Sequence, residues 1–294
     1  MSKTTILFLG LIVAFGSVFL WATSPAPPPT PRAGERNLAN GETVFHIAGC
    51  ASCHAAPKAE GEAKLVLAGG ARFETEFGVF IAPNISTDPE HGIGGWSEAE
   101  FLNAVLNGVS PDGAHYYPAF PYASYARMTV SDAADLWVYM QTLPASATPS
   151  LPSEIGFPFN IRRGLGLWKW LHIKTGSIQE IGEADPVLAR GRYLVEGPGH
   201  CGECHTPRDV TGGMVLANWL HGAPNPDGDG RIPALAGPNS KMAEWSESDI
   251  AEYLRSGFTP DYDVAGGGMV AVIENTSKLS DEDRMAIAAY LKSL

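Results

Sequence analysis

Two short motifs with the same spacing are the residues of this sequence best suited to redox chemistry. They read C-A-S-C-H over 50–54 and C-G-E-C-H over 201–205, and together they use all four cysteines. Two thiols three residues apart can add to the two vinyl groups along one porphyrin edge, and the histidine that follows is then held beneath the iron. We therefore predict two covalent c-type haems, attached through Cys50, Cys53, Cys201 and Cys204 and ligated by His54 and His205.

The two motifs belong to two copies of one longer unit. The cysteine pairs are related by an offset of 151 residues, and the W-S-E sequences that begin at Trp96 and Trp245 by an offset of 149. Each unit ends on a tyrosine and a leucine, at 139 and 143 in the first unit and at 290 and 294 in the second. We expect two tandem domains over 36–145 and 186–294, with a connector over 146–185.

Zinc binding and disulfide formation are the competing uses of such cysteines. A single C-x-x-C pair suits a disulfide or half of a tetrahedral zinc site, and four thiolates together suit zinc. A zinc site built from both pairs would leave both histidines unexplained and would make the two repeated units share one metal ion. The repetition of the motif at equivalent places favours haem over both alternatives.

Helical patterns surround each motif. Apolar residues recur at helical spacing before each motif (41–47 and 189–195), after each tryptophan and at the end of each unit. Ser97-x-x-Glu100 is a capping box, and Thr129 and Ser280 mark the starts of the last helices. Strand-like alternation is confined to 79–81. The pattern predicts an all-α fold whose thin cores need a large apolar group, such as a haem, at their centre.

Methionine is the expected ligand on the other side of each iron, because a thioether stabilises ferrous iron and raises the potential of a His-ligated haem. In the second unit we expect Met269, which follows three glycines in a predicted flexible loop, 64 residues after His205 and before the last helix. Met242 and Met214 are the alternatives in this unit.

In the first unit we expect Met128, which lies 74 residues after His54 and directly before the last helix. Its offset from Met269 is 141, so the two methionines are not equivalent, and the equivalent of Met269 falls near Phe120. Slack in the loop from 118 to 128 would bring Met128 to the iron. The alternatives are His115 or an open sixth position, and an open position would allow chemistry on small molecules.

The N-terminus carries an export signal or a membrane anchor. Residues 6–22 run for 17 positions without a charge, at the border between a signal peptide and a membrane span. No clean small-x-small cleavage site precedes the prolines that follow, so we expect an uncleaved anchor over 1–24 and a stiff proline-rich spacer over 25–35. With either outcome the chain is exported, and we expect it on the periplasmic side of a bacterial inner membrane.

The charge distribution argues against nucleic-acid binding. The net charge is −12, and the two repeated units carry −8 and −6 over 35–142 and 186–294. Nucleic-acid binders need basic faces, whereas acidic domains attract basic partner proteins. Within the neutral connector, 156–172 combines aromatic and basic side chains. This segment is either a strip that docks on a partner or on the membrane, or packing between the two units.

Over nearly all of residues 36–294 the chain resembles a dihaem class I cytochrome c. The loop sequences P-N-I-S-T-D-P-E-H-G-I-G-G-W-S and Y-P-A-F-P-Y-A-S-Y-A-R-M-T are similar to those of cytochrome subunits of membrane-bound periplasmic dehydrogenases, which oxidise alcohols, aldehydes or similar substrates. Alcohol dehydrogenase subunits of that group commonly carry three haem domains and this chain has two motifs, so the resemblance is to the domain type.

The resemblance also bears on single residues. Related sequences often read A-M-P-Y where this chain has a phenylalanine, Phe120, in place of the methionine. Pro83 and Pro233 resemble the loop proline whose carbonyl accepts a hydrogen bond from the proximal histidine, which would orient that ring. A turn proline unrelated to haem is the alternative.

These features together predict an electron carrier. Two low-spin haems would relay single electrons between a dehydrogenase or another respiratory donor and a soluble cytochrome or terminal oxidase. The alternative is a dihaem redox enzyme of the peroxidase kind, which needs one haem open to small molecules. A thiosulfate-oxidising cytochrome would need a further cysteine as an axial ligand, and all four cysteines are already used.

Overall fold

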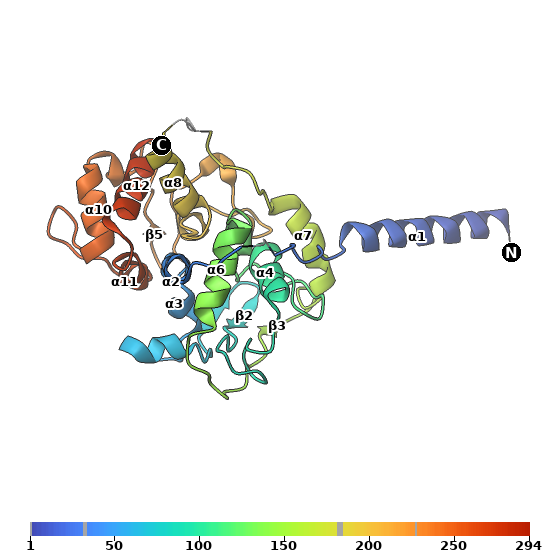
Figure 1. The fold of residues 1–294 in the computed structure, drawn as a ribbon. Coiled ribbons are helices and arrows are strands. Elements are labelled where there is room, and N and C mark those ends of the chain that lie inside the picture. Colours follow the sequence, from blue (N-terminus) through green and yellow to red (C-terminus); the bar gives the residue numbers. More distant parts are fainter. Residues whose placement is uncertain (1, 32–33, 181–184, 227) are drawn as a thin grey trace.

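The computed structural model describes residues 2–31, 34–180, 185–226 and 228–294. Positions 1 and 32–33 of the expected N-terminal segments, and 181–184 of the expected connector, lie outside the described residues. An N-terminal helix, α1 (Lys3–Ala22), projects from a globular body that is formed by two helical domains (Figure 1). None of the residues of α1 is buried. The helix is long and apolar enough to cross a membrane.

The first domain surrounds one apolar core. Its helices are α2 (Leu38–Ile47), α3 (Cys50–His54), α4 (Glu98–Asn107), α5 (Tyr122–Tyr125) and α6 (Val130–Met140), with a 3-10 turn over Gly61–Val66. Its core contains Phe45 of α2, Leu102 of α4 and Leu136 of α6.

The second domain repeats this arrangement. Its helices are α8 (Pro186–Glu196), α9 (Gly202–His205), α10 (Glu247–Ser256), α11 (Met269–Thr276) and α12 (Asp281–Lys292), with 3-10 turns over Leu216–Asn218 and Lys241–Ala243. Its core contains Leu194, Ile250 and Tyr290. Ile47 of the first domain packs into this second core, so the two domains share an apolar contact.

The expected helix starts are confirmed. The Ser97 hydroxyl accepts from the Glu100 amide, and the Glu100 side chain accepts from the Ser97 amide, so a capping box opens α4. Ser246 and Asp249 make the same pair of bonds at α10. The hydroxyls of Thr129 and Ser280 cap α6 and α12.

A glycine allows the first and last helices of each domain to cross closely. A Cβ at Gly41 of α2 would lie 2.1 Å from the Asp135 carbonyl oxygen of α6. At the equivalent crossing of α8 and α12, a Cβ at Gly191 would lie 1.9 Å from the Ala286 carbonyl oxygen. Both distances are far below van der Waals contact, so only glycine permits these crossings.

The fold is mainly helical, as predicted, but strands are more extensive than the single segment expected at 79–81. β1 (Arg72–Thr75), β2 (Gly78–Ile81) and β3 (Glu154–Ile155) form an antiparallel sheet, with Arg72 opposite Ile81 and Gly78 opposite Ile155. β4 (Ala223–Pro224) pairs with β5 (Arg231–Ile232) in the second domain. These strands have two to four residues each, too few for alternation to reveal them, and β3 joins the sheet from a segment more than seventy residues after β2.

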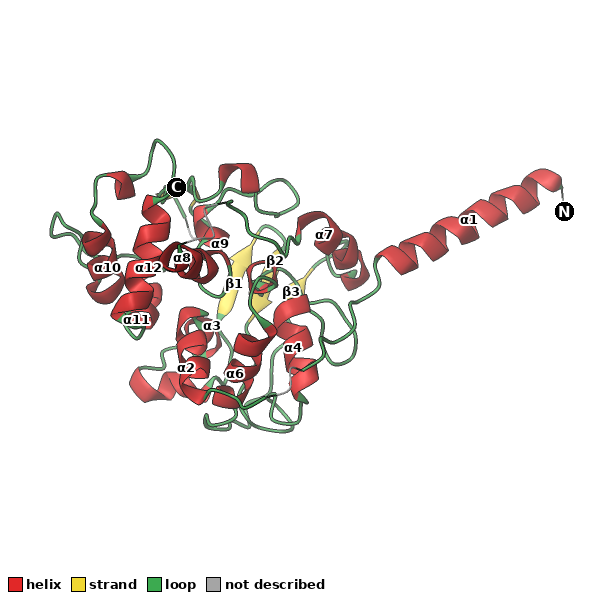
Figure 2. Ribbon diagram, turned by 45° about the horizontal axis from the view of Figure 1, so that its top comes forward, coloured by secondary structure: helices red, strands yellow, loops and turns green. Residues whose placement is uncertain are grey.

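The connector contains a helix that lies where α1 meets the globular body. A 3-10 turn over Arg162–Gly164 leads into α7 (Leu165–His172). α7 lies beside the end of α1 in both views, whereas α10, α11 and α12 of the second domain lie on the far side of the body (Figures 1 and 2). The indole N–H of Trp168 donates to the Thr211 carbonyl of the second domain, and the Trp168 ring meets Tyr122 of the first. The connector therefore packs between the two units on one of its faces.

Candidate haem sites

The first C-x-x-C-H motif forms a single helical turn at the edge of a cavity. Gly49 precedes this turn with a φ of 62°, a left-handed conformation that glycine adopts without strain, so the chain can turn sharply from α2 into α3. Cys50, Cys53 and His54 all line the cavity that opens beside α3. The motif spacing therefore places two thiols and an imidazole on one surface, as the sequence predicted.

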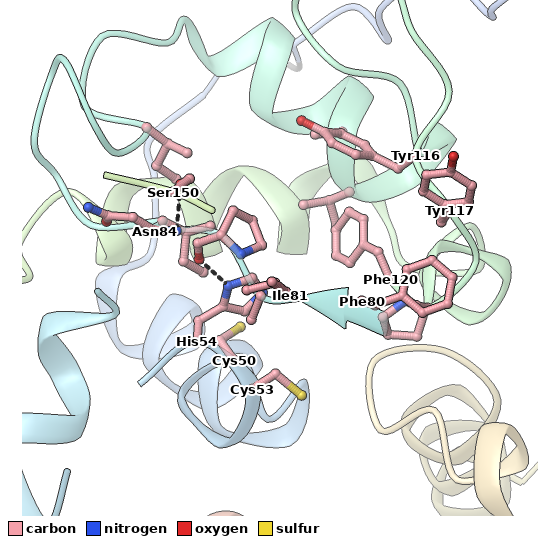
Figure 3. A pocket seen from close by; sticks show the side chains of 18 of the residues that line it. Cys50, Cys53, His54, Phe80, Ile81, Asn84, Tyr116, Tyr117, Phe120 and Ser150 are labelled. Atoms are coloured by element: carbon pink, nitrogen blue, oxygen red, sulfur yellow. Dashed lines mark hydrogen bonds between the residues drawn. The ribbon is translucent and has the colours of Figure 1, made fainter. Parts of the chain in front are cut away.

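The cavity has the size and lining of a cofactor site. Its volume is about 670 Å³, within the range of roughly 300–1,000 Å³ that is typical of ligand pockets. Aromatic and aliphatic side chains lie across from α3, and Figure 3 shows Phe120, Tyr116 and Tyr117 opposite Cys50 and His54. A large flat apolar group fits this cavity, and the residues present thus fit a haem held by the cysteines of α3.

The first histidine is oriented by a backbone carbonyl. His54 Nδ1 donates to the Pro83 carbonyl oxygen over 2.9 Å (Figure 3). This bond leaves the lone pair of Nε2 available to a metal. Burial lowers the pKa of His54, and the bond to Pro83 opposes that shift in part. A neutral imidazole with one free nitrogen is the form that ligates iron.

The second motif repeats this geometry. His205 Nδ1 donates to the Pro233 carbonyl oxygen over 2.8 Å, and burial lowers the pKa of His205 as well. Of the two interpretations of the prolines, the structure supports the one in which their carbonyls orient the histidines. The sequence signal for this role was the resemblance of Pro83 and Pro233 to the loop proline of related sequences, and the two prolines are 150 residues apart, close to the offset of 151 between the cysteine pairs.

The environment of the cysteines bears on the zinc and disulfide alternatives. Among the described residues no three His, Cys, Asp or Glu side chains gather into a metal-binding cluster. Burial, with a smaller contribution from the partner cysteine, raises the pKa of Cys50 and of Cys201 to about 12. Cys50 and Cys201 are thus each buried at their own motif turn, as two separate haems require.

Met128 lies at the first cavity. Its side chain is 6% exposed and lines the cavity together with His54, directly before α6. His115, the alternative ligand, is not among the lining residues, and its Nε2 donates to the Thr23 carbonyl over 2.9 Å. The structure thus brings Met128 and His54 to one cavity and directs His115 elsewhere.

Met269 does not lie in a flexible loop, as we expected, but is the first residue of α11. The glycines before it form a turn in which the Met269 amide donates to the Gly266 carbonyl, and this turn lets a helix start. Its side chain is half-buried against the second core, as are those of the alternatives Met214 and Met242.

Phe120 holds the place in the first domain that Met269 holds in the second. The Phe120 amide donates to the carbonyl three residues earlier, as the Met269 amide does. A short β-bridge precedes each turn, between Val109 and His115 in the first domain and between Phe258 and Val264 in the second. The two bridges are related by an offset of 149, as are Phe120 and Met269. Phe120 also lines the first cavity. Met128 therefore reaches that cavity from a different place in the fold.

Sequence reasoning missed the contribution of the connector to this cavity. Arg162 lines it, donates through Nε to the His115 carbonyl over 2.7 Å, and lies over the ring of Tyr116 at 5.7 Å. Arg162 therefore supplies a cation to a largely apolar wall. The only signal in the sequence was the mixture of basic and aromatic residues in the connector.

The two motif turns meet at the interface between the domains. Ser52 and Glu203 are the third residues of the two motifs, and each bonds to the other domain. The side-chain amide of Asn275 in α11 donates through Nδ2 to Ser52 Oγ over 2.7 Å. Ser124 Oγ of α5 donates to the Glu203 carboxylate over 2.7 Å. Ser52 and Glu203 are related by an offset of 151, and so are Ser124 and Asn275. The two contacts are therefore equivalent in the repeat.

The second cysteines of the two motifs, Cys53 and Cys204, interact electrostatically across this interface. The pKa of Cys53 is raised by burial and further by the thiol of Cys204. Groups attached to these two cysteines would therefore lie at the same interface. The arrangement thus suits transfer of electrons between two neighbouring cofactors.

The chain is similar to known proteins over almost its whole length. Residues 38–144 and 188–294 each match the family model for cytochrome c. Over 286 residues the chain is 53% identical to the "Diheme cytochrome c-type" protein of Cereibacter sphaeroides, covering 97% of this chain and 95% of that protein.

Cytochrome subunits of dehydrogenases are also similar to the chain. It is 34% identical to the cytochrome c subunit of the quinone alcohol dehydrogenase of Gluconobacter oxydans, covering 89% of this chain and 55% of that subunit. It is 37% identical to the gluconate 2-dehydrogenase cytochrome c subunit of Pantoea cypripedii, covering 90% and 60%. The chain thus spans little more than half the length of these two subunits.

Proposed function

Because this chain belongs to the cytochrome c family and is a dihaem electron carrier, we propose that it passes electrons from a periplasmic dehydrogenase to a soluble cytochrome or a terminal oxidase. The observation that carries the proposal is the meeting of the two motif turns at one interface, through equivalent contacts of Ser52 and Glu203. Cytochrome subunits of dehydrogenases among the relatives support the choice of donor.

The proposed haem ligands follow from the two motifs and the two methionines. Cys50, Cys53, Cys201 and Cys204 attach the haems, His54 and Met128 ligate the first iron, and His205 and Met269 ligate the second. When bound, haem supplies one-electron redox chemistry. The protein holds His54 and His205 in place through the carbonyls of Pro83 and Pro233, and it lines the first site mainly with apolar side chains.

A redox-titrated optical spectrum of the haem-loaded protein, with carbon monoxide added to the reduced form, tests this proposal. We expect two six-coordinate low-spin haems that do not bind the added ligand. A haem that binds carbon monoxide readily would contradict the proposed ligand set. It would support instead a redox enzyme with one accessible haem.

We further propose that α1 is retained and anchors the protein on the periplasmic side of the inner membrane. Thr23, the residue after the helix, is fully buried in the body of the protein. Its carbonyl accepts from His115, and its hydroxyl accepts from Arg163 Nε over 2.9 Å. The residues around a potential cleavage point thus take part in the folded structure, which supports an uncleaved anchor.

The intact mass of the protein, purified from membranes with its haems, tests retention of α1. We expect a mass that includes residues 2–22, and resistance of the protein to extraction from the membrane at alkaline pH. A mass that begins near Thr23, or release at alkaline pH, would contradict the anchor.

A further inference from the structure

α7 exposes a stripe of apolar side chains, whereas a helix of a water-soluble domain usually buries its apolar face against the core. The outward stripe consists of Leu167, Trp170 and Leu171, at spacings of three and four residues, and these side chains are 44%, 72% and 49% exposed. The opposite face is the packed one. Lys169 on that face donates through Nζ to the Asn107 and Gly108 carbonyls at the end of α4.

Two further exposed apolar side chains belong to the segment that leads into α7. Phe157 is 81% exposed and Ile161 is 56% exposed. We call the five side chains the α7 surface, and they are Phe157, Ile161, Leu167, Trp170 and Leu171. Large apolar side chains gathered in one short segment mark a contact with a membrane or with another protein.

The place of the α7 surface is set by the end of α1. Gly166 packs so closely on Thr23 that a Cβ at Gly166 would lie 2.7 Å from the Thr23 Cα. Arg163, directly before α7, donates through Nη2 to the Leu20 carbonyl in the last turn of α1. α7 is therefore bound to the end of the apolar helix, as both ribbon views show (Figures 1 and 2).

The length of α1 then places α7 at the depth of the bilayer interface. A helix of 20 residues is about 30 Å long, which matches the hydrocarbon core of a bilayer. When α1 spans the membrane, its last turn lies where hydrocarbon gives way to headgroups. Trp21 in that turn is 80% exposed, and tryptophan is enriched at this level.

The local charge favours the same neighbour. Residues 156–174 contain four basic side chains and no acidic one, in a chain whose net charge is −12; the four are Arg162, Arg163, Lys169 and Lys174. Of these, Lys174 is exposed. Anionic headgroups repel the two acidic domains but attract a segment of this kind.

We propose that the α7 surface lies in the boundary between headgroups and acyl chains of the bilayer that α1 spans, as a second membrane contact. The proposal rests on the proposed anchor. Two contacts fix the tilt of the body, whereas a single helix would let it swing. They also place the first haem site nearer to the membrane, since Arg162 belongs to the same segment and lines the first cavity.

Spin labels on introduced cysteines test this placement, because the four native cysteines are expected to be consumed by haem attachment. Leu167→Cys and Leu171→Cys, which leave Trp170 in place, are labelled in the full-length haem-loaded protein. The protein is reconstituted in nanodiscs of phosphatidylcholine and phosphatidylglycerol. Val210→Cys, at a position 98% exposed in the second domain, is the aqueous control, and Val13→Cys in the middle of α1 reports the anchor.

We expect labels at 167 and 171 to collide with oxygen and to be protected from a water-soluble nickel chelate several-fold better than the label at 210. Labels at 167 and 171 that are as open to nickel as the control, with the label at 13 protected, would overturn the α7 contact and leave the anchor standing. Protection that appears only after a dehydrogenase partner is added would also overturn it, in favour of a protein interface. A label at 13 that is open to nickel would refute the anchor and the inference with it.

Discussion

Replacement of Met128 by leucine separates its proposed role as an iron ligand from its role in the core. Met128 is 6% exposed and lines the same cavity as His54. Leucine has a similar volume but no thioether. Met128→Leu therefore keeps the packing and removes the sulfur, so the first haem loses its sixth ligand and its potential falls.

The size of each effect follows from the structure. A volume-conserving change in a packed core costs less than about 1.5 kcal/mol, whereas Met128→Ala leaves a cavity and costs about 2–5 kcal/mol. The chain has two haem motifs, so loss of one methionine ligand removes half of the methionine–iron charge-transfer absorption. Half of the total haem then binds carbon monoxide.

Met140 supplies a matched control. It is 3% exposed and lines the same cavity from α6. Met140→Leu is expected to leave both spectra unchanged while changing stability by a similar amount. Optical spectroscopy, a carbon monoxide titration and denaturant unfolding measure the three quantities. Full charge-transfer absorption and no carbon monoxide binding in Met128→Leu would refute the assignment, and so would loss of the absorption in Met140→Leu.

The remaining predictions concern the second haem, the helix crossings, one buried histidine and the surface charge. Met269→Leu should remove the other half of the charge-transfer absorption, and an unchanged spectrum would exclude Met269 as a ligand. Gly41→Ala should cost about 1–3 kcal/mol in denaturant unfolding, because its Cβ overlaps a backbone carbonyl, whereas Gly164→Ala, with nothing within 4 Å and a φ of −61°, should be near neutral. Burial lowers the pKa of His115 below 6.5, and no partner for its Nδ1 exists among the described residues, so the unfolded chain takes up a proton that the folded one resists. Stability should therefore fall as pH drops below 6.5, with a slope from this group of at most about 1.4 kcal/mol per pH unit. His115→Gln, whose amide can still donate to Thr23, should lose that slope, and identical pH profiles would contradict the assignment. Because the net charge is −12, electron transfer to a basic soluble cytochrome should slow steeply as salt is raised, and a rate independent of salt would contradict electrostatic steering.

The mainly helical fold and the two domains were predictable from the sequence because their signals are local. A capping box such as Ser97-x-x-Glu100 acts within one helical turn, and the structure contains both of its bonds. The repeat in turn indicated that the two C-x-x-C-H motifs have the same role, because they lie at equivalent places in the two units. The small sheets were not predictable, since β3 is a two-residue strand that exists only through its pairing with β2.

The candidate site was predictable in part. The positions of Cys50, Cys53 and His54 on one turn follow from their spacing, and the structure places all three at one cavity. The contribution of Arg162 was not predictable, because it enters this cavity from a segment more than a hundred residues away. The helical start at Met269 was hidden by the glycines before it, which form a turn rather than a loose loop.

The sequence by itself determined the chemistry of each motif, because the covalent chain sets the distance between residues three or four positions apart. Only the tertiary structure decided which distant groups meet. It showed that Pro83 receives the bond of His54, that Ser52 meets Asn275 across the domain interface, and that α7 turns its apolar side chains outward beside α1. These contacts depend on how cores and loops pack around one another, and no pattern of neighbouring residues records that packing.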